Sequence, residues 1–303
     1  GVREPRLSQL QNLASLYQRS LSFLLSDEPI PTESVLWRMQ PSSEIAADIG
    51  GRFLRLCEQY HNLETWLDER VPCSLPIEVG DSNSFDYTDA EKLAYRIHGE
   101  LGLGDRPGQS LLVTLEEIYG VKVFHLQFES SGSAACTRSD AFGAAILLNS
   151  QSVRWRRNFD LAHELFHLLT WNVFRTRENG EHRTAPDNEE SLANTFASNL
   201  LMPADLVRHA INERIKNGVV FHSDLFDVAR QFDVSVEALM WRMKSLRYFG
   251  DKEHAKSEID RYKESSTHWE VQREHDNPPT RPERFRALAI RAFQRGELSM
   301  GRF

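Results

Sequence analysis

The sequence predicts an α+β fold, on three observations. Most of the chain shows the helical spacing of apolar residues, as in "LSQLQNLASLYQRSLSFLL" (7–25). Two segments are typical of strands: "VKVFHLQF" (121–128) alternates apolar and polar residues, and "AAILLN" (144–149) is short and apolar. With 303 residues, 40% hydrophobic and 26% charged, the chain is long enough and apolar enough to bury a core.

The N-terminal half contains several predicted helices separated by turn residues. The helix at 7–25 is followed by "SDEPIPTES" (26–34), whose Pro and Ser content is typical of a linker. The expected elements that follow are an amphipathic helical region at 43–70, a loop at 73–85, helices at 89–104 and 110–120 that both end at glycine, the strand at 121–128, and a turn-rich segment up to the strand at 144–149.

The C-terminal half is predicted to be helical. A helix begins near Ser152 and a polar loop follows at 178–190. Further helices are expected at 190–203, as two short helices with a turn near Asp233 within 224–250, and at 282–299, with a charged helix or linker between the last two.

Charge and cysteine content exclude several classes of protein. The formal net charge of -8 argues against a chain built mainly to coat nucleic acid. Three widely spaced cysteines indicate neither a disulfide framework nor a cysteine zinc site, and free thiols favour a cytoplasmic protein. No signal peptide or apolar run long enough for a membrane span is visible, and the opening residue is not Met, which favours a fragment of a longer protein.

The stretch "FDLAHELFHLL" (159–169) carries the clearest chemical pattern. His163 and His167 lie four residues apart, so on a helix both imidazoles can reach one metal ion at about 2 Å. Glu164 lies roughly 100° around the helix, where it can reach a metal-bound water as a general base. The alternative is a chance HExxH on a core helix, but burying these polar groups among apolar neighbours is costly without a metal partner.

A catalytic metal needs a third protein ligand, and the candidates downstream are His182, Asp187, Glu189 and Glu190. Glu190 is favoured, because Asn194 lies one helical turn further on the same face and can orient a ligand histidine. Acidic residues also stabilise a helix N-terminus without any metal, so an ordinary first turn is the competing interpretation.

These motifs resemble a known family. "RRNFDLAHELFHLLTW" (156–171) followed by "ESLANTFASNLLMP" (190–203) is similar to the ImmA/IrrE family of zinc metallo-endopeptidases, and the similarity extends over roughly 88–250. The resemblance implies a zincin-like metallopeptidase core, with a small mixed β-sheet and an HExxH helix, flanked by helical N- and C-terminal segments. It implies Zn²⁺ bound by His163, His167 and Glu190, with Mn²⁺ or another divalent ion as alternatives, and Glu164 as the catalytic residue.

The chain departs from the family pattern in two places. Phe166 stands where glycine is common, and the loop before Glu190 is long and acidic. Neither departure removes a chemical group that the resemblance assigns.

A second resemblance lies at the start of the chain. "GVREPRLSQLQNLASLYQRSLSFLL" is similar to the last helices of an XRE-type helix-turn-helix domain, and an ordinary amphipathic helix is the alternative. The expected division is an XRE remnant at 1–30, a helical linker region at 31–87, the metallopeptidase domain at 88–250 and a helical extension at 251–303.

The two resemblances together imply a function. We expect a zinc-dependent endopeptidase that hydrolyses a peptide bond in a regulatory protein, an XRE-type repressor, in a stress, phage or mobile-element response. Operator DNA through the missing N-terminal module and a homodimer are further expected partners, and no membrane partner is expected. One alternative is a DNA-binding regulator whose peptidase-like domain senses without cutting. Another is a structural metal site, against which Glu164 and the three-ligand set argue.

Four further residues are weaker candidates. His182, His209 and His222 can stabilise an oxyanion, although surface histidines are the plainer interpretation. Cys136 can supply a thiolate to the metal, although most lone cysteines are small packed residues.

Overall fold

The structure, a computed structural model, describes most of the chain: residues 5–16, 21–25, 35–38, 42–128, 134–175, 187–214, 221–265 and 276–299. The N-terminal helices are α1 (Leu7–Leu16), α2 (Leu21–Leu24), α3 (Ser43–Leu67), α4 (Tyr87–Glu100) and α5 (Pro107–Val113), which continues into the π-helical turn η1 (Thr114–Ile118). The later helices are α6 (Arg154–Leu169), α7 (Trp171–Phe174), α8 (Asp187–Leu201), α9 (Ala204–Asn212), α10 (His222–Phe232), α11 (Val236–Ser245), α12 (Lys252–Ser265) and α13 (Glu283–Gln294).

A small mixed sheet forms the centre of the fold. Its strands are β1 (Leu36–Trp37), β2 (Lys122–Leu126), β3 (Ala134–Ser139) and β4 (Gly143–Asn149). Their order is β1-β3-β4-β2, with β2 parallel to β4 and the other pairs antiparallel. The predicted α+β class with a small mixed sheet and an HExxH helix is confirmed.

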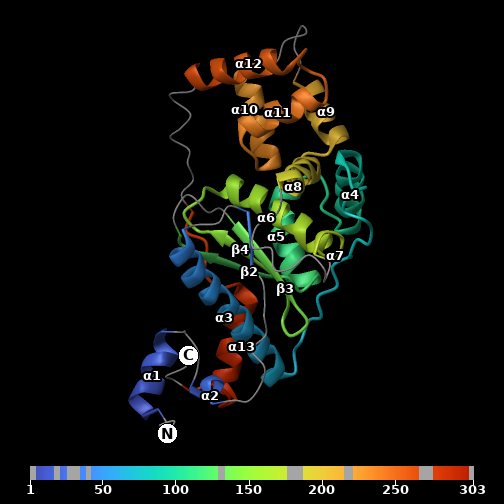
Figure 1. The fold of residues 1–303 in the computed structure, drawn as a ribbon. Coiled ribbons are helices and arrows are strands. Elements are labelled where there is room, and N and C mark those ends of the chain that lie inside the picture. Colours follow the sequence, from blue (N-terminus) through green and yellow to red (C-terminus); the bar gives the residue numbers. More distant parts are fainter. Residues whose placement is uncertain are drawn as a thin grey trace.

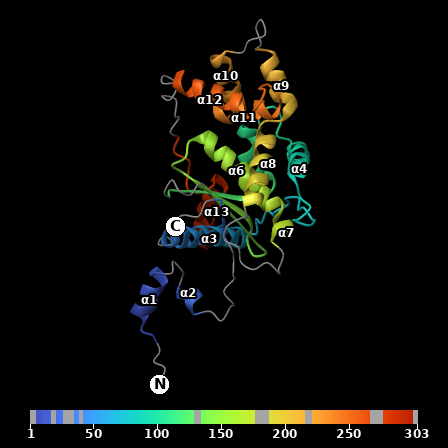
Figure 2. The ribbon, with the colours of Figure 1, turned by 45° about the horizontal axis from the view of Figure 1, so that its top comes forward.

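Each face of the sheet is covered by its own set of helices (Figures 1 and 2). Alternation along the strands sends successive side chains to opposite faces. In β4, Ile146 and Leu148 join the core that contains α6 and α8, whereas Ala145 and Leu147 join the core that contains α3 and α13. We call these the α6 face and the α3 face.

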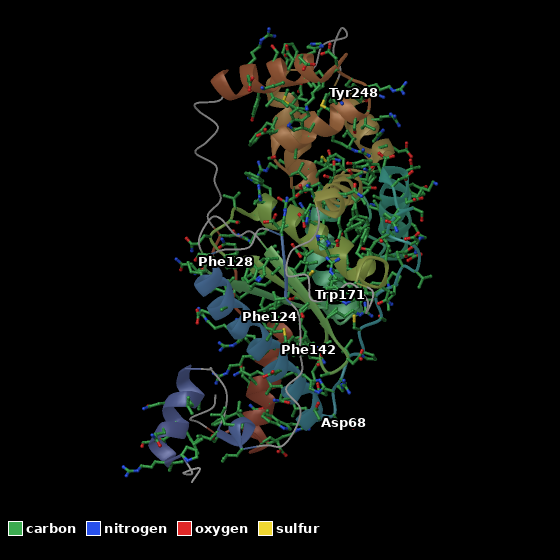
Figure 3. The ribbon with its side chains drawn as sticks, in the orientation of Figure 1. Asp68, Phe124, Phe128, Phe142, Trp171 and Tyr248 are labelled. Carbon is green, nitrogen blue, oxygen red and sulfur yellow. The ribbon has the colours of Figure 1, made fainter. Side chains whose placement is uncertain are left out.

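Aromatic rings fill the α3 face. Phe124 packs edge-on against Phe53, Tyr60 and Phe285, at centroid distances of 6.1, 6.3 and 6.3 Å. Phe124, Phe128 and Phe142, which are labelled in Figure 3, belong to the hydrophobic cluster on this face. Helices far apart in sequence, α3 and α13, therefore share one hydrophobic cluster with the sheet.

Most predicted elements occur close to their expected bounds. Asp233 lies at the expected turn, with a left-handed φ of 57°, and Gly120 ends the η1 turn with a φ of 66°. Among the described residues, no helix combines the length and apolar character that crossing a membrane requires. The predicted domain boundaries stay predictions.

Three elements differ from the sequence-based expectation. The segment expected to be turn-rich contains β3, and β1 lies just after the expected linker. The expected strand β4 pairs with both β3 and β2 and is interior, and β1 borders β3. No element was expected at 204–212, where helix α9 begins directly after Pro203.

Candidate metal centre

Helix α6 places the two histidines side by side on a buried face. It packs against β3, β4 and α8, and His163, Glu164 and His167 are 0%, 0% and 1% exposed. The rings of His163 and His167 lie 5.0 Å apart, as their four-residue spacing predicts. Burial of three ionisable groups in one helix requires specific partners.

Helix α8 supplies those partners. It lies against α6 and begins at Asp187, so Glu190 is in its first turn, where the helix dipole favours a carboxylate. Glu190 keeps 20% of its side chain exposed, and Asn194 lies one turn further along the same face.

The side chains of three predicted ligands converge. The two Nε2 atoms of His163 and His167 lie 3.2 Å apart. The carboxylate oxygens of Glu190 lie 3.1 Å from His163 Nε2 and 3.4 Å from His167 Nε2. Within the part of the chain that the structure describes, this is the one group of at least three potential ligands whose atoms lie within 4.8 Å of one another.

The spacing fits a tetrahedral metal ion. Ligand atoms at roughly 2.05 Å from Zn²⁺ with tetrahedral angles lie about 3.3 Å from one another. The three measured separations are close to that value. Three protein ligands also leave one position for water or substrate, as a catalytic site requires.

The other nitrogen of each histidine has its own partner. His163 Nδ1 lies 3.1 Å from Asn194 Oδ1, and His167 Nδ1 lies 2.8 Å from Glu189 Oε1. If each Nδ1–H donates to its oxygen partner, both Nε2 lone pairs point at the shared position. The tautomers that these contacts favour are the ones that metal binding needs.

Sequence reasoning missed the role of Glu189. It considered this residue as a third ligand, but the side chain is 2% exposed and contacts His167 from behind. Arg175 donates two hydrogen bonds to the same carboxylate, at 2.8 and 2.9 Å. The sequence signal for this role was the adjacency of Glu189 and Glu190, because two consecutive residues of a helix can contact the two nitrogens of one histidine, here His167.

Glu164 differs from every other carboxylate of the site. It is fully buried, and among the described residues neither of its oxygens has a hydrogen-bond partner, although the Cys136 thiol lies close by. Burial raises the pKa of Glu164 to about 7, against the lowering effect of His167. A carboxyl with this pKa can accept and return a proton near neutral pH.

The pKa values of the three ligand side chains are shifted in different directions. Burial lowers the pKa of His163 to about 3. Burial also acts to lower the pKa of His167, but hydrogen bonds to Glu189 and Glu190 raise it to about 9. Burial acts to raise the pKa of Glu190, but its bonds to both histidines lower it to about 2.

The remaining candidates do not join this cluster. Asp187 is exposed in the first turn of α8, and His209 is exposed and lies 3.3 Å from Glu213. His182 and the side chain of His222 lie outside the described residues. Phe166, where glycine is common in the family, is buried against Phe85, Phe174 and Phe196.

The fold and this cluster together define a metallopeptidase-like domain. Residues 116–244 match the family of M78 peptidases, described as "IrrE N-terminal-like domain". The resemblance to the ImmA/IrrE family is therefore confirmed over these residues, which are less than half of the chain. The match supports peptidase chemistry in general and contains all four predicted metal-site and catalytic residues.

Similarity to individual proteins is low. No curated protein sequence matches the chain at a significant level. One similar solved structure is described as a Mycobacterium tuberculosis transcriptional regulator, with 17% identity and a TM-score of 0.36. The match covers 62% of this chain and 51% of that chain, so only about half of the other protein is matched.

Proposed function

We propose that the protein is a zinc-dependent endopeptidase. The observation that carries this proposal is the convergence of His163, His167 and Glu190 beside the fully buried carboxylate of Glu164, which the Cys136 thiol approaches. A bound divalent ion supplies Lewis-acid polarisation of a carbonyl and makes water more acidic. Zn²⁺ fits the nitrogen and oxygen ligands, and Mn²⁺ is the alternative.

The residues of the chain then have distinct tasks. His163, His167 and Glu190 hold the ion, and Asn194 and Glu189 fix the two imidazoles. Glu164 takes a proton from the attacking water and delivers it to the amide nitrogen of the departing peptide. Its raised pKa suits both halves of that transfer.

We propose a regulatory protein, an XRE-type repressor, as the substrate class. The support is the ImmA/IrrE-type domain, together with the amphipathic residues 7–25 that resemble the end of an XRE module. Helices α1 and α2 lie in that stretch. The cytoplasmic location, operator-DNA binding and dimer formation remain proposals of the same kind.

The test is cleavage of a co-encoded XRE-type repressor by the zinc-loaded chain. We expect a discrete pair of fragments with the wild type, and a rate about a thousandfold lower with Glu164→Gln, because the proton carrier is lost. Asp187→Asn is the matched control, since this acid lies outside the cluster. Full activity of Glu164→Gln would contradict the mechanism, and bound metal without any cleavage would favour the sensor alternative.

A further inference from the structure

The metal centre borders strand β3, because the Cys136 thiol lies close to Glu164. Glu164 and His163 have no exposed surface, and yet a peptide must reach them for hydrolysis. The chain's own residues 35–38, which contain β1, lie on this side. They come from outside the residues that match the peptidase family.

The backbone of this segment follows β3 as an added peptide strand would. Leu36 pairs with Cys136 and Trp37 with Ala135, antiparallel, and the Arg38 N–H donates to Ala134 O at 3.2 Å. Cys136 is the residue whose thiol lies beside Glu164. A peptide added to a sheet edge gains affinity from such main-chain bonds and specificity from side-chain pockets.

The pairing is short. β1 has two residues, whereas β3 has six. Few hydrogen bonds therefore hold the segment by its backbone, and its side chains decide how firmly it is held.

The side chain of Arg38 lies in a site formed by side chains of α6 and α8. Its guanidinium donates to Asp160 Oδ1 and, at 3.1 Å, to Asn194 Oδ1, and it lies 5.3 Å from the centre of the Phe159 ring. A carboxylate, an amide oxygen and an aromatic face are the groups that bind a guanidinium. Arg156, half exposed, also contacts Asp160 Oδ1 at 3.3 Å.

The site that binds the Arg38 guanidinium can accept a further hydrogen bond. Asp160 is completely buried, and its Oδ2 has no hydrogen-bond partner among the described residues. A carboxylate in this state can accept a second bond from a bidentate guanidinium. The site also adjoins the metal centre, because Asn194 Oδ1 contacts both Arg38 and His163.

We propose that residues 35–38 occupy the place of a peptide substrate along β3, and that Phe159, Asp160 and Asn194 select substrates that present an arginine in the position of Arg38. The inference rests on the proposed peptidase function and names its substrate class. An extended peptide with an aliphatic residue two positions before arginine displaces β1 and brings its backbone to Glu164.

An internal occupant competes strongly with a free peptide. A segment tethered in the same chain has an effective concentration on the order of millimolar, so a peptide of equal intrinsic affinity binds only near that concentration. Loss of the Arg38 contacts weakens the occupant and lets the external peptide bind at lower concentration.

The experiment measures binding in the full-length, zinc-loaded Glu164→Gln chain, which separates binding from hydrolysis. The probe is fluorescein-labelled ESVLWRMQ, the sequence of residues 33–40, and its partner probe carries alanine in place of arginine. We expect the additional substitution Arg38→Ala to tighten binding of the arginine probe about tenfold or more, from the loss of charge-assisted bonds, and to leave the alanine probe weak. Arg52→Ala, an exposed arginine on α3, should change neither affinity.

A second variant covers the case in which Arg38→Ala does not fold. Asp160→Asn keeps the size of the side chain and should abolish the preference for the arginine probe. Equal affinity of Arg38→Ala for both probes, no gain in its affinity for the arginine probe, or a retained arginine preference in Asp160→Asn would overturn the proposal. Binding with the expected preference, but no hydrolysis of the arginine probe by Arg38→Ala with Glu164 intact, would contradict the peptidase proposal and leave the arginine site standing.

Discussion

The two faces of the sheet differ in the partners that they offer to a buried carboxylate. On the α3 face, Glu64 is 2% exposed and contacts Lys122 at 3.1 Å and Arg284, which also donates to Tyr60 at 3.3 Å. Both oxygens of this carboxylate have a cationic partner. On the α6 face, Glu164 is equally buried and, among the described residues, has no hydrogen-bond partner on either oxygen.

This difference indicates that the buried carboxylate on the α3 face serves stability and the one on the α6 face serves function. A buried charge with partners can be retained for the fold, whereas a buried carboxylate without partners costs free energy that the fold does not recover locally. The same face also contains two single carboxylate oxygens, Asp160 Oδ2 and Glu190 Oε1, that are buried and lack a hydrogen-bond partner among the described residues. We interpret the α6 face as the side of the sheet that carries the chemistry and the α3 face as the side that stabilises the fold.

The largest effect is expected on the α3 face. Glu64→Gln leaves Lys122 buried without a compensating charge, so we expect the free energy of unfolding to fall by roughly 3–5 kcal/mol. Urea denaturation measures this change. Glu69→Gln is the control, because its contact with Arg291 at 2.8 Å is partly exposed and should contribute less than about 1 kcal/mol. Similar small losses in both variants would show that the Glu64 cluster is not a stabilising element.

A smaller effect is expected from the carboxylate behind His167. Glu189→Gln removes the charge that Arg175 and His167 share, so zinc affinity should fall about 10–100-fold while the fold is kept. Competition with a chromophoric chelator measures the affinity, and Asp187→Asn on the same helix is the control. Unchanged affinity would mean that Glu189 holds Arg175 rather than the metal ligand.

The smallest effect concerns Glu164 and depends on pH. Because the folded-state pKa of about 7 exceeds the usual 4.5, the folded protein binds the proton more tightly, and stability is lost as pH rises from 4.5 through 7. Glu164→Gln escapes this loss. In metal-free protein we expect the variant to be more stable than the wild type by about 1–2 kcal/mol at pH 8, and by less at pH 5. A variant that is less stable at pH 8 would contradict the view that this carboxylate is retained for chemistry.

The sequence predicted those parts of the site that depend on local spacing. His163 and His167 follow from a four-residue helical interval, and Glu190 with Asn194 from the same interval on the next helix. The contacts of Glu189 with Arg175, and of Arg38 with Asp160, join segments 14 and 122 residues apart and depend on tertiary packing. No periodicity in the sequence carries that information.

The sheet was predicted less completely, for a physical reason. β2 and β4 are rich in apolar and branched residues, whereas β3 contains Ser, Thr, Arg and small residues, which are typical of turns. Its pairing with β4 fixes it as a strand. β1, with two residues, is too short for any alternation to be recognised.

Metal stoichiometry tests the central claim most directly. The full chain, purified, stripped with a chelator and reloaded with Zn²⁺, should retain one ion per chain by mass spectrometry of the metal content. Glu190→Gln should retain much less under the same dialysis, and Asp187→Asn should retain one. Absence of bound zinc in the wild type, or equal retention in Glu190→Gln, would contradict the proposal that His163, His167 and Glu190 form a metal centre.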